Sequence, residues 1–354
     1  MSESKLTLVI ATKDRPQMVR RQLDYYKQQK CEYKILIGDS STNGNAEEMY
    51  SIANEYSAYL NISYNHLPEA NVGDCQLILS KKITTRYSMC VADGAFAIVK
   101  NIPKLVDYLD KNPEYVMAHG KSLIFTLKGS NPYGKLTSIG DYSLPISESD
   151  SSESRFTDHL SNYRVSLYCV MKTEVWKKIW RLSINIPNTS LAHEVVPCCL
   201  SIIIGKCKEI NTLYLVRHIH TMRPKLSHPE DWVKQNNWNE SRELAITILA
   251  STLSENTNET KKSKTRLVAA EFDRYIRRGI ERKNAAKKKS VSIMQKAIKI
   301  LDLALNPLRA VLNPIRFYLT NSYETTNKYN FMSKRHPFHK DLKPLVTALQ
   351  QKSR

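Results

Sequence analysis

Short apolar runs alternate with amphipathic stretches along the first 125 residues. Continuous apolar runs predict strands covered on both faces, and they lie at 6–12, 33–41, 61–67 and 87–96. Apolar residues at helical spacing predict helices between these strands, at 17–29, 46–60 and 74–83. Because strand–helix–strand alternation requires right-handed crossovers, the pattern predicts an α/β fold, Rossmann-like, with a mostly parallel sheet flanked by helices.

The alternation continues beyond residue 100 and is interrupted once. A helix over 101–113 and a strand over 115–127 are expected next. Residues 129–160 are rich in loop-forming residues and contain an acidic, serine-rich stretch. A segment of this kind indicates either a mobile lid or acceptor loop, or a plain surface excursion.

The pattern then returns to regular elements up to about residue 220. A strand followed by a helix is predicted over 163–180. Residues 191–210 are expected to begin as a helix with Glu194 in its first turn, and a strand is expected through 211–220.

Positive charge is concentrated after residue 225. The chain carries 53 Lys and Arg against 34 Asp and Glu, a net charge of +19, and residues 226–354 hold 25 basic and 12 acidic side chains. Such a region suits an anionic partner, either a membrane surface or a nucleic acid. The sequence therefore predicts two domains, an α/β domain over 1–225 and a basic α-helical region over 226–354.

One stretch of this basic region, residues 292–319, is amphipathic. Its apolar residues recur at helical spacing, basic residues lie off that stripe, and Pro307 and Pro314 would kink or break the helix. Two interpretations stay open: docking to an anionic bilayer, or packing on the α/β domain with a solvated basic face. Nucleic-acid binding is disfavoured, because the aromatic interleaving and helix-turn-helix or zinc-finger spacings are missing.

The chain is expected to be cytoplasmic, peripheral at the inner face of the membrane. No run of about 18 uncharged apolar residues predicts a spanning helix, and the N-terminus does not resemble a signal peptide. The seven cysteines form no C-x-x-C pair and mostly lie in apolar runs, so we expect them to be buried and reduced.

Polar residues that can carry chemistry follow the predicted strands. Asp14-Arg15-Pro16 follows the first strand, where the Arg15 guanidinium offers a planar fork to phosphate oxygens. Asp39, at the end of the second strand, can accept hydrogen bonds from a base or ribose. Asp93, at the end of the fourth, can ligate a divalent cation, and Glu194 can act as a general base. Each acid also has a structural interpretation, as a helix cap or a first-turn carboxylate.

The chain resembles the family 2-like inverting glycosyltransferases of the GT-A fold, in the bacterial branch that makes surface polysaccharides. The resemblance spans roughly residues 5–225. The segments that carry it are LTLVIATKDRPQMVRRQLDYY at the N-terminus, ILIGDSS at 35–41, VADGAF at 91–96 with the helix after it, and HEVVPCCLSIIIGKCKEINTLYLVRHIH at 193–220.

This resemblance implies a nucleotide-diphosphate sugar donor and a set of site residues. The donor-binding positions are Thr12, Arg15, Asp39, Asp74 and Asp93, with the diphosphate near Asp93. Glu194 matches the acidic position used as the base. His218 and His220 match a place near the diphosphate, where an imidazole can ligate a metal or stabilise the leaving group; Asp93 and His220 are the expected metal ligands.

One departure from the family concerns the acidic motif at the fourth strand. The family shows two or three acids before the Phe, and here the stretch is Asp93-Gly94-Ala95-Phe96. Because paired carboxylates hold the Mg²⁺ or Mn²⁺ that offsets the diphosphate charge, we expect weak metal binding, metal independence with cationic side chains instead, or loss of activity.

The resulting functional expectation is an inverting hexosyltransferase. It would extend a glycan, expected to be lipid-linked, in capsule or O-antigen synthesis, and its basic region would dock to anionic lipid. The alternative is a catalytically degenerate, glycosyltransferase-like scaffold at the membrane, which Gly94 and Ala95 favour. Glu194, Arg15 and Asp39 oppose that alternative.

Overall fold

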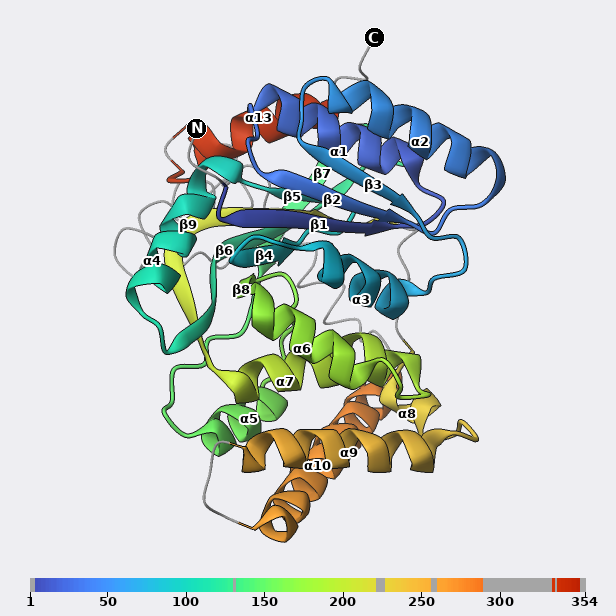
Figure 1. The fold of residues 1–354 in the computed structure, drawn as a ribbon, viewed down its shortest axis with the longest axis vertical. Helices are drawn as coiled ribbons and strands as arrows, with labels where there is room; N and C mark the ends of the chain where they lie inside the picture. Colours follow the sequence, from blue (N-terminus) through green and yellow to red (C-terminus); the bar gives the residue numbers. More distant parts are fainter. Residues whose placement is uncertain are drawn as a thin grey trace.

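Nine strands of the described chain form one mixed sheet with helices on both faces (Figure 1). The computed structural model describes residues 4–129, 132–220, 227–255, 260–288, 333–334 and 336–350. The strand order is β3-β2-β1-β4-β8-β6-β9-β5, and β7 pairs with β6. The predicted α/β class, mostly parallel with flanking helices, is confirmed.

The first part of the sheet is parallel, as the sequence predicts. Its strands are β1 (Leu6–Thr12), β2 (Lys34–Asp39), β3 (Ile62–His66) and β4 (Tyr87–Cys90). The crossover helices are α1 (Pro16–Gln28), α2 (Asn43–Ser57) and α3 (Val72–Lys82). Parallel pairing brings the carboxyl ends of these four strands to one edge, where ligands of open α/β sheets bind.

The second part of the sheet is mixed. It contains β5 (Ala95–Ala97), β6 (Tyr115–Leu127), β7 (Leu136–Tyr142), β8 (Val170–Lys172) and β9 (Lys206–His218). The associated helices are α4 (Ile102–Lys111), after the 3₁₀ turn Val99–Asn101, then α5 (Ser152–Ser161), α6 (Thr173–Ser183) and α7 (Val196–Ile204). β6 runs parallel to β9, whereas β8, β7 and β5 are antiparallel to their neighbours.

Two local expectations were wrong. The apolar run 87–96 is not one strand: β4 ends at Cys90, and β5 begins at Ala95 and pairs with β9. Asp93 therefore lies in the turn between two strands. The segment 129–160 is not mainly loop, since it contains β7 and α5. The serines of this segment were expected to lie in a loop, but Ser151 is the N-cap of α5, where its hydroxyl accepts a hydrogen bond from Ser154 N.

The two faces of the sheet are covered by two separate hydrophobic cores. Side chains of α1, α2 and α4 belong to one core, and those of α3, α5, α6 and α7 belong to the other. Figure 1 shows α1 and α2 on one side of the sheet and α3, α5, α6 and α7 on the other. Part of the C-terminal region joins the second core through α9 (Trp238–Ser254) and α10 (Lys261–Lys288), preceded by the short α8 (Pro229–Trp232).

The last helix, α13 (His339–Gln350), returns to the first core and lies beside α1 (Figure 1). Leu342, Leu345 and Leu349 are fully buried there. Asp341 accepts a hydrogen bond from Asn101 Nδ2 at 3.1 Å and pairs with Lys100 Nζ at 2.6 Å. The described helices of the basic region therefore pack into both cores: α9 and α10 into the second and α13 into the first. The amphipathic stretch 292–319 lies outside the described residues.

All seven cysteines are unpaired, and six of them are buried, as expected. Within the described ranges, no helix has the length and hydropathy that crossing a bilayer requires.

Candidate active site

A hydrogen-bonded cluster forms at the carboxyl ends of β1 and β4. Thr12 Oγ1 donates to Asp93 Oδ2 at 2.8 Å, and Arg15 Nε lies 2.8 Å from the same oxygen. Asp93 is 3% exposed, so its carboxylate is held by the Thr12 hydrogen bond and the Arg15 ion pair rather than by water. The turn at residues 13–15, just before α1, positions Arg15, whose Nε also donates to Lys13 O at 3.2 Å.

Asp39, the last residue of β2, forms a second fixed carboxylate at the same edge. Its Oδ2 accepts from the Tyr64 hydroxyl at 2.8 Å, and its Oδ1 accepts from Ser41 N at 2.9 Å. Asp14 adopts a φ of 54° and links the two loops, because its backbone N–H donates to Ser41 Oγ at 2.7 Å. Two acids far apart in sequence thereby become parts of one rigid rim.

The acidic motif that the family shows is replaced by a histidine-lined corner. A Cβ on Gly94 would lie 3.0 Å from His220 Nε2, so the His220 ring fills the space that a side chain at this position would need. His218 stacks on Phe125, with ring centroids 4.9 Å apart, and lies 5.3 Å from the His220 ring. The sequence analysis grouped Asp93 with His220, and the structure places His220 beside Gly94, next to Asp93.

This corner does not fit the divalent-cation site expected from the resemblance. Asp93 is its one carboxylate, and the Asp93 Oδ2 atom already holds the Arg15 cation and the Thr12 hydroxyl. Among the residues that the structure describes, no group of three or more His, Cys, Asp or Glu side chains is arranged to hold a metal ion.

A buried cation that the sequence analysis missed lies behind this corner. Arg21 of α1 is fully buried, with its guanidinium 5.1 Å from the Phe96 ring and 3.4 Å from His218 Nδ1. Burial, with the nearby Arg21 and His220 charges, lowers the pKa of His218 to about 3, so this imidazole is neutral at physiological pH. The sequence carries a sign of this buried cation, because Arg21 falls between Met18 and Tyr25 on the apolar face of the helix, where a charged residue is unusual.

Glu194 lies in a π-helical turn, Leu191–Val195, that leads directly into α7. Asn188 Oδ1 caps the turn by accepting from Leu191 N at 3.0 Å. The Tyr163 hydroxyl donates to Glu194 Oε1 at 3.4 Å. Burial raises the pKa of Glu194, while the Tyr163 hydrogen bond and the Arg217 charge act in the opposite direction. A carboxylate of raised pKa is a stronger base than an exposed one.

Arg217 connects Glu194 to the Asp93 turn. It pairs in register with Ala95, two residues after Asp93, and its charge acts on Glu194. Its guanidinium lies 4.0 Å from the Tyr168 ring and 4.6 Å from the Tyr142 ring, and NH2 donates to Tyr168 Oη at 2.8 Å. Because successive side chains of a strand point to opposite faces, β9 presents Arg217 to Glu194 and His218 to α1.

Asp74 lies in the first turn of α3, apart from the Thr12–Arg15–Asp93 cluster. Its backbone N–H donates to the N-cap Asn71 Oδ1 at 3.0 Å, and its charge acts on His193, next to Glu194. A Cβ on the preceding Gly73 would lie 2.5 Å from the His193 ring, so α3 packs closely on the Glu194 turn.

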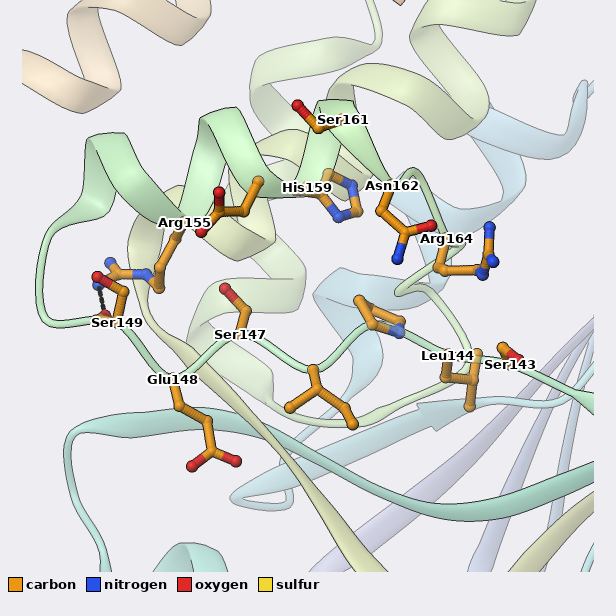
Figure 2. A pocket seen from close by; sticks show the side chains of 13 residues that line it. Ser143, Leu144, Ser147, Glu148, Ser149, Arg155, His159, Ser161, Asn162 and Arg164 are labelled. Atoms are coloured by element: carbon orange, nitrogen blue, oxygen red, sulfur yellow. Dashed lines mark hydrogen bonds between the residues drawn. The ribbon is translucent and has the colours of Figure 1, made fainter. Parts of the chain in front are cut away.

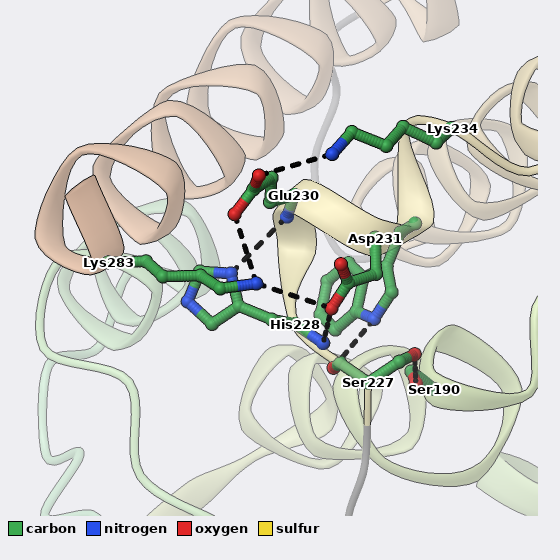
Figure 3. A network of polar contacts seen from close by, with 8 residues as sticks. Ser190, Ser227, His228, Glu230, Asp231, Lys234 and Lys283 are labelled. Atoms are coloured by element: carbon green, nitrogen blue, oxygen red, sulfur yellow. Dashed lines mark hydrogen bonds and ion pairs between the residues drawn. The ribbon is translucent and has the colours of Figure 1, made fainter. Parts of the chain in front are cut away.

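The Glu194 turn is also tied to the C-terminal helices, through α8 (Figure 3). Ser190, just before the turn, shares a hydrogen bond of 3.0 Å with Ser227. Glu230 of α8 pairs with Lys283 of α10 at 2.9 Å. Through these contacts α8 and α10 support the position of the turn.

Solved structures with the same architecture are glycosyltransferases, although no family model and no curated protein matches the chain. S. aureus TarS 1–349 in complex with UDP-GlcNAc aligns over 93% of this chain and 91% of its own, with 14% identity and a TM-score of 0.51. The full TarS structure aligns over 98% of this chain, with 15% identity and a TM-score of 0.48, and the chain spans 54% of its length. The Pyrobaculum calidifontis mannosyltransferase PcManGT, in complex with GDP-Man and Mn²⁺, aligns over 99% of this chain with 12% identity and a TM-score of 0.40.

The fold expected from the sequence resemblance is confirmed by the TarS 1–349 alignment, which covers nearly all of both chains. The chain has the GT-A fold of glycosyltransferases, with a mixed, mostly parallel sheet flanked by helices and further helices after it.

Proposed function

We propose that this protein is an inverting glycosyltransferase that moves a sugar from a nucleotide-diphosphate donor to a hydroxyl of a glycan acceptor. The observation that carries the proposal is the rim formed by Thr12, Arg15, Asp39 and Asp93 at the carboxyl ends of parallel strands, with Glu194 beyond Arg217. The GT-A fold and the UDP-GlcNAc bound in the TarS 1–349 structure support this choice of donor.

Donor binding is assigned to the rim. Asp39 would accept hydrogen bonds from the base or ribose, since its carboxylate is held in place by Tyr64 and Ser41. Arg15, which is nearly buried, would present its remaining guanidinium N–H groups to the diphosphate. Asp74 stays a prediction, since its contacts in the structure are with α3 and the Glu194 turn.

Glu194 would act as the base in a single displacement. Its carboxylate takes the proton of the acceptor hydroxyl while that oxygen forms a bond to the anomeric carbon. The bond from this carbon to the diphosphate oxygen breaks on the opposite face, and its electron pair leaves with the nucleoside diphosphate. Attack opposite the leaving group inverts the configuration.

We propose that the diphosphate charge is offset by cationic side chains rather than by Mg²⁺ or Mn²⁺. The Arg15–Asp93 pair occupies the place of the acidic motif, and the His220 ring fills the space beside Gly94. Arg15 pairs with Asp93, and the charge of the buried Arg21 also interacts with Asp93, so both are placed to supply this positive charge.

Calorimetric titration with UDP, GDP, CDP and dTDP, each with manganese and with chelator, tests the donor proposal. We expect one nucleotide to bind equally well under both conditions. Manganese-dependent binding would overturn metal independence and retain the transferase. If no nucleotide binds, the proposal fails and the degenerate scaffold becomes the better interpretation.

A lipid-linked acceptor, a role in capsule or O-antigen synthesis and docking to the inner membrane face stay predictions from the resemblance and the basic region. Deleting residues 285–354 would not test docking cleanly, because it removes the buried leucines of α13. Replacing Lys287, Lys288 and Lys289 by Gln removes three charges and retains α13. We expect this variant to sediment less with phosphatidylglycerol vesicles; equal sedimentation would argue against docking through this basic run.

A further inference from the structure

A polar groove lies between the segment 143–149 and α5 (Figure 2). Its volume is about 530 Å³, which is within the range of small-molecule sites, roughly 300–1,000 Å³. The segment crosses from the end of β7 to the start of α5, and it is held to the sheet edge by paired backbone hydrogen bonds between Ser147 and Cys207. Its far wall is the side of α5 that carries Arg155, Asp158 and His159, together with the turn after the helix.

The walls of the groove are neutral overall and rich in hydroxyl and amide groups. Serine hydroxyls and the Asn162 amide line it together with Leu144, Pro145 and Ile146, and Ile146 is 59% exposed. Two cations, Arg155 and Arg164, are balanced by two acids, Glu148 and Asp158. Sugars present both hydroxyls and apolar C–H faces, so this mixture of groups suits a glycan.

Two of the charged groups of the groove, Arg155 and Glu148, are held by protein partners. Arg155 donates to the carbonyl oxygens of Ser149, Asp150, Ile202 and Ile203 at 2.8–2.9 Å. Glu148 accepts from Lys208 Nζ at 2.8 Å. These side chains therefore shape the walls, and Arg155 in particular is not available to neutralise a phosphate or a carboxylate of a ligand.

His159 provides a buried polar group without a partner. It lines the groove, it is 95% buried, and its Nε2 makes no hydrogen bond with any described residue. Burial lowers the pKa of His159 to about 4, so the ring is neutral and carries one N–H donor and one acceptor nitrogen. A buried polar atom without a partner destabilises the fold, and a hydrogen bond from a ligand hydroxyl would remove that cost.

Two contacts connect the groove to the proposed base. The His159 ring lies 5.1 Å from the Tyr163 ring, and the Tyr163 hydroxyl donates to Glu194. At the same end, Ser143 follows Tyr142, whose ring lies 4.6 Å from the Arg217 guanidinium. A chain-like ligand in the groove would thus extend toward Glu194.

We propose that this groove binds the neutral, hydroxyl-rich part of the glycan acceptor, beyond the sugar unit whose hydroxyl is attacked. The inference rests on the proposed transferase function and adds the acceptor site to it. Asn162 and His159 are assigned to the contacts with acceptor hydroxyls, and Ile146 to the contact with the apolar face of a sugar ring.

The test uses the full chain, labelled with a fluorophore, on an array of neutral, uronate-bearing and phosphate-bearing oligosaccharides. Three variants are compared with the wild-type protein. Asn162→Trp fills the groove, Asn54→Trp makes the same change at an exposed site on α2, and His159→Phe removes the imidazole but keeps a ring against Tyr163. Circular dichroism melts confirm that each variant is folded.

We expect the wild-type protein and Asn54→Trp to bind neutral oligosaccharides equally. Binding by Asn162→Trp should be at least about tenfold weaker, and binding by His159→Phe about three- to tenfold weaker. The inference is overturned if no neutral oligosaccharide binds, if only the acidic ones bind, or if both Trp variants bind alike.

The nucleotide titration, repeated on the same four proteins, separates this inference from the donor proposal. Nucleotide binding that is unchanged in Asn162→Trp, together with lost glycan binding, supports both. Nucleotide binding without glycan binding would overturn the acceptor role of the groove and leave the donor proposal in place. Glycan binding without nucleotide binding would overturn the transferase proposal, and with it the acceptor role of the groove.

Discussion

The two sides of the candidate site hold their carboxylates by different means. On the donor side, Asp93 and Asp39 are each fixed by donors within 3 Å, namely hydroxyl, amide and guanidinium groups. On the other side, the described residues give Glu194 one long hydrogen bond, from Tyr163 at 3.4 Å, and the Arg217 charge also acts on it.

This difference matches two chemical tasks. Groups that position a charged donor work best when they are rigid and already paired, because no reorganisation is then needed on binding. A base must exchange a proton, and burial with few hydrogen bonds raises its pKa and its proton affinity. Under the proposed function, Asp39 and Asp93 belong to the part of the site that positions the donor, and Glu194 is the group that accepts the proton.

The largest effect is expected from Glu194→Gln, which removes the base and retains the shape. Transfer should fall about 10³-fold, within the usual range for a general base, while calorimetry should show unchanged nucleotide affinity. Turnover equal to that of the wild-type protein would remove Glu194 from the mechanism.

The same variant should be at least as stable as the wild-type protein. Because the folded-state pKa of Glu194 is raised, its ionised form weakens folding at every pH above its ordinary value. Gln removes that cost, so the melting temperature at pH 7 should stay equal or rise. A clear decrease would show that the Arg217 attraction outweighs burial.

A second test breaks the donor side through Arg15→Met. Nucleotide affinity should fall about 10- to 100-fold, because the guanidinium fork is lost and the Asp93 charge is left unopposed. Isothermal titration measures this directly. Arg20→Met is the control, since Arg20 lies on α1, which follows Arg15, and pairs with Glu55 at 2.8 Å, away from the rim.

Two buried histidines, His218 behind the Asp93 corner and His159 beside the groove, are neutral, which predicts that acid lowers the stability of the fold. The pKa of His159 is lowered to about 4 and that of His218 to about 3, from an ordinary 6.5. The unfolded chain takes up these protons near pH 6.5 and the folded chain does not, so the free energy of unfolding decreases as the pH falls from 6.5 to about 4. His159 alone accounts for up to about 3 kcal/mol.

Urea unfolding at pH 7 and pH 4.5 measures this loss. His159→Gln should reduce the difference between the two pH values, because one of the neutral histidines is gone. An unchanged difference would mean that other groups cause the acid sensitivity.

The smallest effect is expected from Tyr163→Phe. Losing the hydroxyl removes a hydrogen bond that lowers the pKa of Glu194, so the acid limb of the pH–rate profile should move to higher pH. The rate on the plateau should change less than about threefold. A limb that stays in place would argue that Tyr163 does not contact Glu194 during the reaction.

The sequence predicted most of the architecture because its strands are short, apolar and separated by clear helical patterns. It also predicted that Asp39 and Asp93 share one sheet edge, since parallel strands leave no other arrangement. The prediction was wrong at 87–96, because the apolar pattern continues across the turn between β4 and β5. It was also wrong at 129–160, because several serines there belong to α5 and its N-cap.

Local pattern by itself determined the α/β class, the strands that carry the rim, the helix that carries Glu194 and the excess of charge in the last third of the chain. Only the tertiary structure decided which groups meet: Arg15 with Asp93, Arg21 with His218, Tyr163 and Arg217 with Glu194, and α13 with α1. The reason is physical. Periodicity reports which face of an element is buried, whereas contacts between residues far apart in the sequence depend on how the faces of different elements pack together.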